Sequence, residues 1–293
     1  MGKVQKMIAQ SKYKKLFTYL FVSLTLLVTP ACLERSNIHE VKGLILLEQA
    51  IPSLDENSLV IFDVDETLIE AENLWRSDVN KKAKSIWYPL YQKIHKTVSS
   101  RDKKRVLFSR MAMALKPILI DKNVPQIIDQ IKKQDTKMLA LTKFFPGKFG
   151  DMENSEEHRF QELKKLGIDF SSSFPQYTSF EMPELSDKKP APVFHKGVIS
   201  TSHCTKGEAL VGFLNRINWW PNRIIFIDDK IENLKEVAQI AKERNINFLG
   251  LHYRAAENLP CTVDQEVAEF QINYLIEKEE WISEDKAKEE MIK

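Results

Sequence analysis

The sequence predicts an α/β fold: a doubly wound parallel sheet with helices on both faces and an inserted, mainly helical cap. Short apolar runs with the composition of buried strands alternate with segments of helical periodicity, which is typical of α/β domains. One long aromatic-containing stretch interrupts this alternation just after the first strand. The composition agrees, because 43% hydrophobic and 29% charged residues in a chain of 293 exclude collagen-like, low-complexity and disordered proteins.

Five apolar runs have the length and the β-branched content of buried strands. They are continuously apolar, which is typical of strands in a parallel sheet that is covered on both faces. These runs are residues 59–62, 138–141, 198–200, 224–227 and 248–251.

Four helices are predicted between or after these strands, each from apolar residues that recur three and four positions apart. Asn123 is a candidate N-cap for the first helix. Asn154 and Glu157 have the spacing of a capping box for the second, which Gly167 ends. The apolar faces are Val124, Ile127, Ile128 and Ile131; Phe160, Leu163 and Leu166; Leu210, Phe213, Leu214 and Ile217; and Leu234, Val237, Ile240 and Ala241.

Two insertions interrupt the core. Residues 70–122 are helical in pattern and too long for a simple crossover, so we expect them to form a cap. Trp75 and Arg76 are the cap residues expected to reach a site behind the first strand, and residues 171–196 read as a second, loop-like insertion. The predicted core is residues 55–69 and 123–260, followed by a helical tail at 261–293 that packs through Val267, Phe270, Ile272 and Leu275.

The N-terminus predicts export. Residues 1–31 contain five lysines and no acid, then an uncharged run that Thr29-Pro30-Ala31 ends. A basic region, a short apolar core and a small-residue exit are the layout of a secretory signal peptide. We therefore expect residues 1–31 to be a signal peptide and the protein to be periplasmic or secreted.

Membrane contact is expected only through this segment. Cleavage after Ala31 would leave Cys32 first, where it could carry a lipid anchor, although Thr29 stands where a lipobox usually has an aliphatic residue. An uncleaved anchor is the other alternative, since the uncharged run is at the short edge of a spanning helix. Cys204 and Cys261 could pair, or could be two separate buried thiols.

Charge excludes one class of partner. The formal net charge is only +2, so no electrostatic footprint for nucleic acid is present. The lysine and arginine run at 103–105 fits either a solvated helix face or a surface that attracts an anionic substrate.

Acidic pairs follow two of the predicted strands. Asp63 and Asp65 come after the first strand, and Asp228 and Asp229 after the fourth. Ligands of open α/β sheets bind at the carboxyl ends of strands, so the two pairs meet if the strands are neighbours. Buried carboxylates need a partner, and a hard divalent cation with oxygen ligands suits them.

These residues resemble the haloacid dehalogenase (HAD) superfamily. Asp63-Val64-Asp65-Glu66-Thr67-Leu68 is similar to its motif I, Asp-x-Asp-x-Thr, and Asp228-Asp229 with Asn233 to its motif IV. Thr142 stands where motif II has Ser or Thr. Lys206 fits motif III better than Lys196, which lies inside or just before a strand. The resemblance covers about residues 55–255 and implies a Rossmann-like core.

The resemblance implies a set of roles. Asp63 would be the nucleophile that forms an aspartyl-phosphate, and Asp65 the general acid and base. Mg²⁺ would be held by Asp63, the main-chain carbonyl of Asp65, and Asp229, with Asp228 or Asn233 assisting from outside. Thr142 would bind a phosphoryl oxygen, and Lys206 would neutralise the charge on Asp63.

A carboxylate at Asp65 favours phosphatase chemistry within the superfamily, because dehalogenases lack it there. The resemblance thus implies an exported Mg²⁺-dependent phosphohydrolase acting on a small phosphorylated substrate. The alternatives are a non-catalytic HAD-fold binding or effector protein, and a phosphotransferase. Residues 192–198, Lys206-Gly207 and the Asp-Asp-Lys pattern also resemble a family of exported bacterial HAD-like proteins.

Overall fold

The structure is a computed structural model that describes residues 37–72 and 77–293. The predicted signal peptide, Cys32, Trp75 and Arg76 lie outside the described residues. Residues 37–293 form one unit of the chain, and all that follows concerns that unit.

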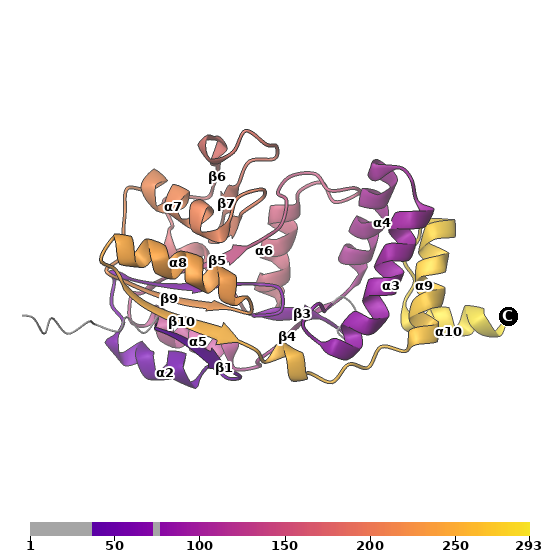
Figure 1. Ribbon diagram of the computed structural model, residues 1–293, viewed down its shortest axis with the longest axis horizontal. Coiled ribbons are helices and arrows are strands. Elements are labelled where there is room, and N and C mark those ends of the chain that lie inside the picture. Colours follow the sequence, from indigo (N-terminus) through magenta and orange to yellow (C-terminus); the bar gives the residue numbers. More distant parts are fainter. Residues whose placement is uncertain (1–36, 73–76) are drawn as a thin grey trace, which may run out of the picture. The chain divides into compact units, whose positions relative to one another are not determined.

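An eight-stranded, mostly parallel sheet forms the centre (Figure 1). The six strands from one edge to β8 run parallel to one another. Strand β7 then pairs antiparallel with β8, and β6 pairs antiparallel with β7. All five predicted strands are confirmed. In spatial order the strands are β1 (Ile38–Val41), β10 (Asn247–Tyr253), β9 (Arg223–Asp228), β2 (Ser58–Phe62), β5 (Lys137–Thr142), β8 (Val198–Ser200), β7 (Val193–His195) and β6 (Ser179–Glu181).

Helices cover both faces of the sheet, as predicted (Figure 1). Successive side chains of a strand point to opposite faces, so Leu59 and Ile61 enter one apolar core while Val60 and Phe62 enter the other. Helices α7 (Lys206–Arg216) and α8 (Ile231–Glu243) pack on the first face, and α2 (Ile45–Ala50) and α5 (Val124–Lys132) on the second. Helix α6 (Ser155–Lys165) packs Leu163 on this second face.

Several elements were not predicted. Residues 38–50, assigned to no domain above, add strand β1 and helix α2 to the core. The insertion at 171–196 is only partly loop, because β6 and β7 extend the sheet there. Polar side chains interrupt these short strands, at His39 and Glu40, at Glu181 and at His195, so they lack the apolar run that predicted the similarly short β8. Short 3-10 helices also lie at separate places along the chain, at Ile51–Ser53, Ser171–Ser173, Pro183–Leu185 and Ala256–Asn258.

The predicted caps are correct only in part. Asn123 occupies the N-cap position of α5, but its side chain makes no cap hydrogen bond, because its backbone is already helical. The Asn154 side chain does accept from the Glu157 backbone at 2.7 Å. Glu157 does not complete the capping box, since its carboxylate binds Gln161, His195 and Lys196 instead. Gly167 follows the helix in the left-handed region, at φ 81°.

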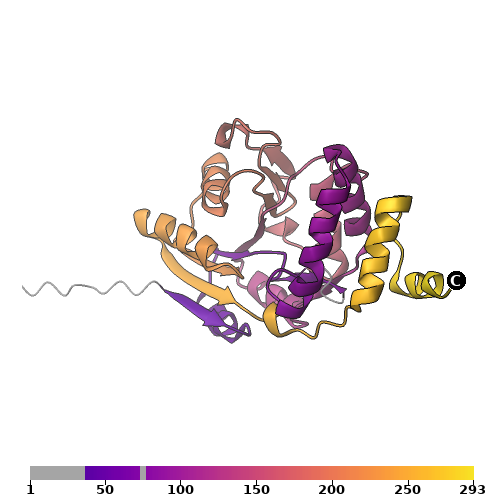
Figure 2. The same ribbon diagram turned by 45° about the vertical axis from the view of Figure 1, so that its right-hand side comes forward.

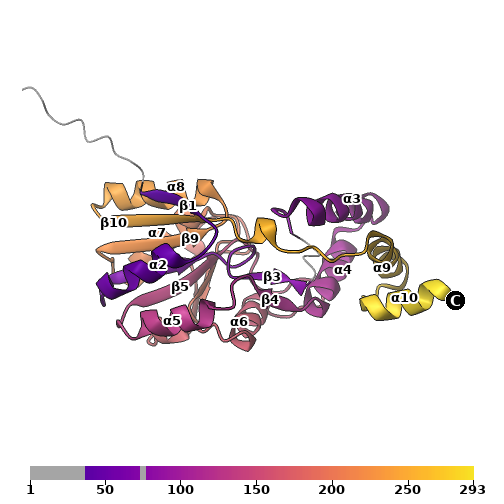
Figure 3. The same ribbon diagram turned by 90° about the horizontal axis from the view of Figure 1, so that it is seen from below.

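The cap region begins and ends in a small antiparallel sheet of β3 (Ile69–Ala71) and β4 (Pro117–Leu119). Between these strands lie helices α3 (Lys81–Thr97) and α4 (Arg101–Ala114), capped by the side chains of Asn80 and Ser100. Figures 2 and 3 show both helices beyond the end of the sheet toward which β10 points.

The C-terminal tail packs on the cap. Helices α9 (Gln265–Lys278) and α10 (Glu284–Ile292) follow the last strand, and α9 runs beside α3 (Figures 1 and 3). Ile272 and Leu275 of α9 share an apolar cluster with Ile94 and Leu107 of the cap. Val267 is buried as predicted, whereas Phe270 is only partly so. The cap and the tail are far apart in the sequence, but their side chains therefore share one apolar core.

Two further findings concern the described residues. Cys204 and Cys261 form no disulfide with each other, so they are separate thiols, but only Cys204 is buried as expected and Cys261 is partly exposed. Within residues 37–72 and 77–293, no helix has both the length and the apolar character needed to cross a membrane.

Candidate functional site

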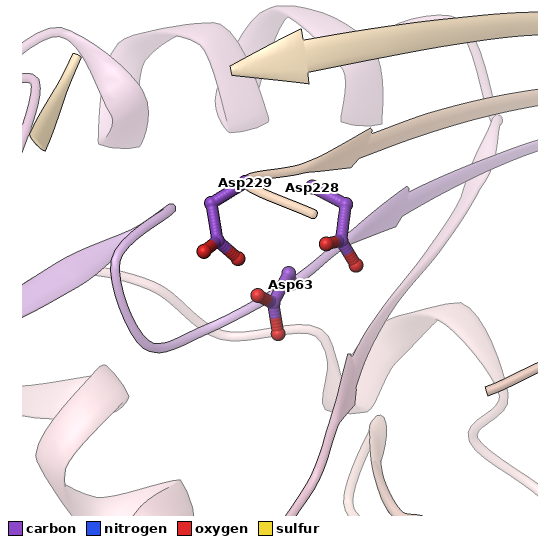
Figure 4. Close-up of side chains that lie close together, drawn as sticks. All are labelled: Asp63, Asp228 and Asp229. Carbon is purple, nitrogen blue, oxygen red and sulfur yellow. The ribbon is translucent and has the colours of Figure 1, made fainter. Parts of the chain in front are cut away.

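Three carboxylates converge where strands β2 and β9 end (Figure 4). Asp63 follows β2, Asp228 is the last residue of β9 and Asp229 comes next. One oxygen of each lies within 4.8 Å of the others, and all three residues are buried. The two strands are parallel neighbours, and the Asp63 backbone N–H donates to the Ile227 carbonyl at 2.9 Å, which holds the acidic ends level.

Lys206 joins the carboxylates from the first position of α7. Its Nζ lies 2.5 Å from Asp63 Oδ1 and 2.7 Å from Asp228 Oδ2. A capping box of Thr205 and Glu208 fixes the start of this helix. Burial alone would lower the pKa of Lys206, but Asp63 and Asp228 outweigh it and raise that pKa above its usual value, so the ammonium remains charged.

Lys196, the weaker motif III candidate, is elsewhere. Its Nζ binds Glu157 Oε2 at 2.8 Å, and His195 binds the same oxygen at 2.6 Å. The structure therefore brings Lys206, and not Lys196, to the acidic cluster.

Asp228 has its oxygens occupied by the protein. Besides Lys206, it accepts from the Lys230 backbone N–H at 2.8 Å and from Asn233 Nδ2 at 2.9 and 3.1 Å. The Asn233 amide therefore faces Asp228, and both residues support the cluster from outside its centre.

Asp229 has no such partners. Both carboxylate oxygens are buried, and neither makes a hydrogen bond within the described part of the chain. Burial, together with the nearby Asp63, raises the pKa of Asp229 well above its ordinary value. His252 Nε2 lies 2.9 Å from the Asp229 main-chain oxygen and holds the backbone in place.

This donor set fits a divalent cation. Asp63 and Asp229 offer oxygen atoms that face each other, and neither oxygen of Asp229 makes a hydrogen bond in the described residues. The nearest counter-charge to Asp229 among those residues is the Lys230 ammonium, whose Nζ lies 3.8 Å from Oδ2, beyond hydrogen-bond distance. Hard oxygen ligands of this kind suit Mg²⁺. The main-chain carbonyl of Asp65, two residues beyond Asp63, remains the predicted third ligand.

The Asp65 carboxylate lies apart from the cluster. Its side chain is 50% exposed and pairs with Arg159 at 3.0 Å. Arg159, on α6, was not singled out from the sequence; its position in the helix that follows Thr142 was the only available signal. Its guanidinium also lies over the Phe144 ring and near Glu162.

Thr142 ends β5, beside the end of β2. Its hydroxyl is buried and has no hydrogen-bond partner in the described residues, and the same holds for Thr201 after β8. The Thr201 backbone N–H donates to the Thr142 carbonyl at 3.0 Å, so the two lie together. Thr201 is a second buried hydroxyl that the sequence analysis missed.

Glu66 links the acidic loop to the cap. Its backbone is left-handed, at φ 63°, and its Oε1 accepts from Ser77 Oγ and from the backbone of Asp78 and Val79. The Glu66 side chain of motif I thus contacts the residues just before α3. From the sequence alone, Glu66 is only one of the variable positions of the motif.

A pocket of about 830 Å³ lies between the core and the cap. Asp65, Arg159 and Lys230 line it beside the acidic cluster, and helices α3 and α4 line the opposite wall. The basic run divides here: Lys104 and Arg105 line the pocket, whereas Lys103 pairs with Glu279 at 2.7 Å.

The fold and site define a mixed α/β protein with a buried acidic cluster at the strand ends. The chain belongs to DUF2608, a family described as proteins of unknown function, whose model matches residues 34–288. No solved structure matches the chain.

Relatives occur in two groups of bacteria. An "Uncharacterized protein" of Rickettsia bellii is 25% identical over 248 residues, which cover 82% of this chain and 83% of the relative. A Chlamydia trachomatis protein named "Putative outer membrane protein" is 24% identical over 274 residues, covering 86% and 90%. A Chlamydia pneumoniae protein with the same leading name is 23% identical over 266 residues, covering 88% and 90%.

Proposed function

We propose that this protein is an exported, Mg²⁺-dependent phosphohydrolase of the HAD type that cleaves a phosphate monoester through an aspartyl-phosphate on Asp63. The observation that carries the proposal is the acidic cluster: Asp63 lies against Asp229, whose buried oxygens receive no hydrogen bond from the described residues, and against Lys206 at 2.5 Å. A cluster that only stabilised the fold would have its oxygens satisfied, as Asp228 has.

Asp63 carries the covalent step. One of its carboxylate oxygens attacks phosphorus as the bond from phosphorus to the alcohol oxygen breaks. Lys206 stabilises the charge on Asp63 and on the transferring phosphoryl group. The buried hydroxyl of Thr142 is free to donate to a phosphoryl oxygen.

Asp65 carries the proton. It donates to the leaving alcohol oxygen in the first step. In the second it takes a proton from the water that attacks phosphorus, as the bond from phosphorus to the Asp63 oxygen breaks and phosphate leaves. Its half-exposed carboxylate lines the pocket, where a leaving group has access to it. Arg159 orients this carboxylate.

Asp63, Asp229 and the Asp65 carbonyl would hold Mg²⁺. When bound, the ion offsets the repulsion between the Asp63 carboxylate and the anionic substrate and stabilises the phosphoryl oxygens. Asp228 and Asn233 position Lys206 and the adjoining backbone.

Export is part of the proposal. The signal-like N-terminal segment supports it, as do the names of the chlamydial relatives. A phosphohydrolase outside the cytoplasm would act on phosphate esters in the periplasm or the surroundings.

The test is hydrolysis of phenyl phosphate by the purified protein, with Mg²⁺ and with a chelator. We expect turnover that requires Mg²⁺ and that falls at least about a thousandfold in Asp63→Asn, because the nucleophile is lost. Asp187→Asn, in the exposed loop before β7, is the matched control and retains the wild-type rate.

Absence of turnover across a panel of phosphate esters by the folded protein would reject the proposal. It would favour the non-catalytic binding protein instead. Transfer of phosphate to an added alcohol in preference to water would favour a phosphotransferase.

A further inference from the structure

Helix α4 presents one face to the pocket, and the chemical character of this face changes along the helix. Its lining residues recur three and four positions apart, so they lie on one side of the helix. The face is basic in the first turns, at Arg101, Lys104 and Arg105, aromatic at Phe108 and aliphatic at Met111 and Leu115. The aliphatic end leads into β4, which pairs with β3 just behind the acidic loop. The basic end is therefore the end of α4 remote from that loop.

The basic end has unmatched charge. Arg101 and Lys104 form no ion pair within residues 37–72 and 77–293, although Lys103, between them, pairs with Glu279. Arg105 is held by the Lys148 carbonyl at 2.9 Å and lies over the Phe149 ring. Two unpaired cations on a pocket wall attract an anion.

The middle of the pocket is aromatic. Tyr91 and His95 of α3 and Phe108 of α4 form a cluster of three rings, with centroids 4.4 to 5.7 Å apart. Phe144 and Phe149 of the core line the same pocket. Aromatic side chains on the walls of a pocket recognise planar rings by stacking and edge contacts.

The pocket is long. Lys104 and Leu115 are about 16 Å apart along the axis of α4, from its rise of about 1.5 Å per residue. The volume of about 830 Å³ is in the upper part of the range for small-molecule sites. A simple sugar phosphate at the acidic cluster would leave the aromatic and basic parts without contact.

We infer that the substrate is an elongated phosphate monoester whose alcohol part contains an aromatic ring system and ends in a second anionic group. The phosphate faces Asp63 and Lys206, the ring lies among Tyr91, Phe108 and the core phenylalanines, and the second anion meets Arg101 and Lys104. This inference rests on the proposed phosphohydrolase function for the position of the phosphate.

Three probes separate the two parts of the inference: phenyl phosphate, biphenyl-4-yl phosphate and 4′-carboxybiphenyl-4-yl phosphate. For the wild type, kcat/KM should rise from the first to the second because of ring contacts. We expect kcat/KM to rise again, by about tenfold, for the third probe, because its carboxylate would form a hydrogen bond between charged groups. The ratio between the third and second probes measures the distal anion site alone.

The double variant Arg101→Gln/Lys104→Gln should reduce that ratio to near unity, mainly through KM. Lys81→Gln/Lys84→Gln removes the same charge from exposed positions of α3 and should retain the wild-type ratio. A ratio near unity in the wild type, or an unchanged ratio in the Arg101/Lys104 variant, would overturn the inference.

Calorimetry separates this result from failure of the proposed function. Binding of the non-hydrolysable 4′-carboxybiphenyl-4-yl methylenephosphonate is measured for the wild type and both double variants. If no probe is hydrolysed, about tenfold weaker binding to the Arg101/Lys104 variant alone still supports the pocket. Equal binding by all three proteins overturns it.

Discussion

At the scale of single residues, Asp228 and Asp229 are adjacent in the sequence but differ in the hydrogen bonds that they receive. Both are buried carboxylates at the end of β9, yet Asp228 receives hydrogen bonds from Lys206, Asn233 and the backbone, while Asp229 receives none. A satisfied buried carboxylate stabilises its surroundings, whereas an unsatisfied one carries a cost that a ligand can offset.

Asp229→Asn should therefore stabilise the metal-free protein. We expect the free energy of unfolding in a chelator to rise by about 1–3 kcal/mol, because burial beside Asp63 makes the Asp229 carboxyl costly in the folded state, whether it is ionised or takes up a proton. Added Mg²⁺ should stabilise the wild type and not the variant. Denaturant unfolding with and without Mg²⁺ measures both effects.

Asp228→Asn is the informative comparison. It removes one of the two carboxylate partners of Lys206 and should lower the free energy of unfolding, which is the opposite sign. If Asp229→Asn also destabilised the metal-free protein, the buried oxygens of Asp229 would have partners of their own, and the argument for a cation would fail.

At the scale of elements, Glu157 joins helix α6 to the turn between β7 and β8. Its carboxylate binds Gln161, Lys196 and His195. That turn has Lys196 and Gly197 at φ 47° and 86°, the positive values that a two-residue hairpin requires. A Cβ on Gly197 would lie 2.6 Å from the Phe170 backbone, so only glycine fits.

This contact should make stability depend on pH. The hydrogen bonds from Gln161, Lys196 and His195 lower the pKa of Glu157 from 4.5 to about 2. A lowered folded-state pKa stabilises above 4.5, and the contribution is lost as the pH falls from 4.5 through about 2. We expect Glu157→Gln to lower the free energy of unfolding by only about 1 kcal/mol near neutral pH, because solvent partly screens the group.

Denaturant unfolding between neutral pH and pH 3.5 or so, at several values, should show the difference between wild type and variant shrink below 4.5. Glu153→Gln removes an exposed carboxylate that pairs with Lys148; it is the control and should have little effect. A Glu157→Gln difference that stays constant with pH would contradict the assigned ion pairs.

Helix α9 packs on the cap, although the second segment of the core lies between α9 and the cap in the sequence. Ile272 is fully buried in the cluster that contains Ile94 and Leu107. Asn80, which caps α3, also donates to the carbonyls of Glu257 and Leu259 in the segment leading to α9. The cap is therefore connected to the core by a third stretch of chain.

Ile272→Ala should loosen the cap. The cavity should lower stability by about 2–5 kcal/mol, and the amides of α3 and α4 should exchange hydrogen faster while those of β2 and β9 remain protected. Hydrogen exchange measured by peptide mass detects this. The exposed Glu277→Ala is the control, and uniform acceleration through the core would contradict a separate cap cluster.

At the scale of the whole molecule, the parts that the sequence predicted are those with strong local signals. Continuous apolar runs predicted β2, β5, β8, β9 and β10, because strands buried on both faces need apolar side chains at every position. The short strands β1, β6 and β7 have no such pattern. They form because a neighbouring strand in the sheet offers hydrogen bonds. The sequence alone does not reveal which strand that neighbour is.

The same division applies to the site. Local sequence patterns were sufficient to place Asp63, Thr142 and Asp228 at the ends of strands and Lys206 at the start of a helix. The hydrogen-bond partners of these residues, the pairing of Arg159 with Asp65 and the packing of α9 on the cap became known only from the folded chain. Local patterns follow from the preferences of each segment, whereas partners depend on which distant segments fold against each other.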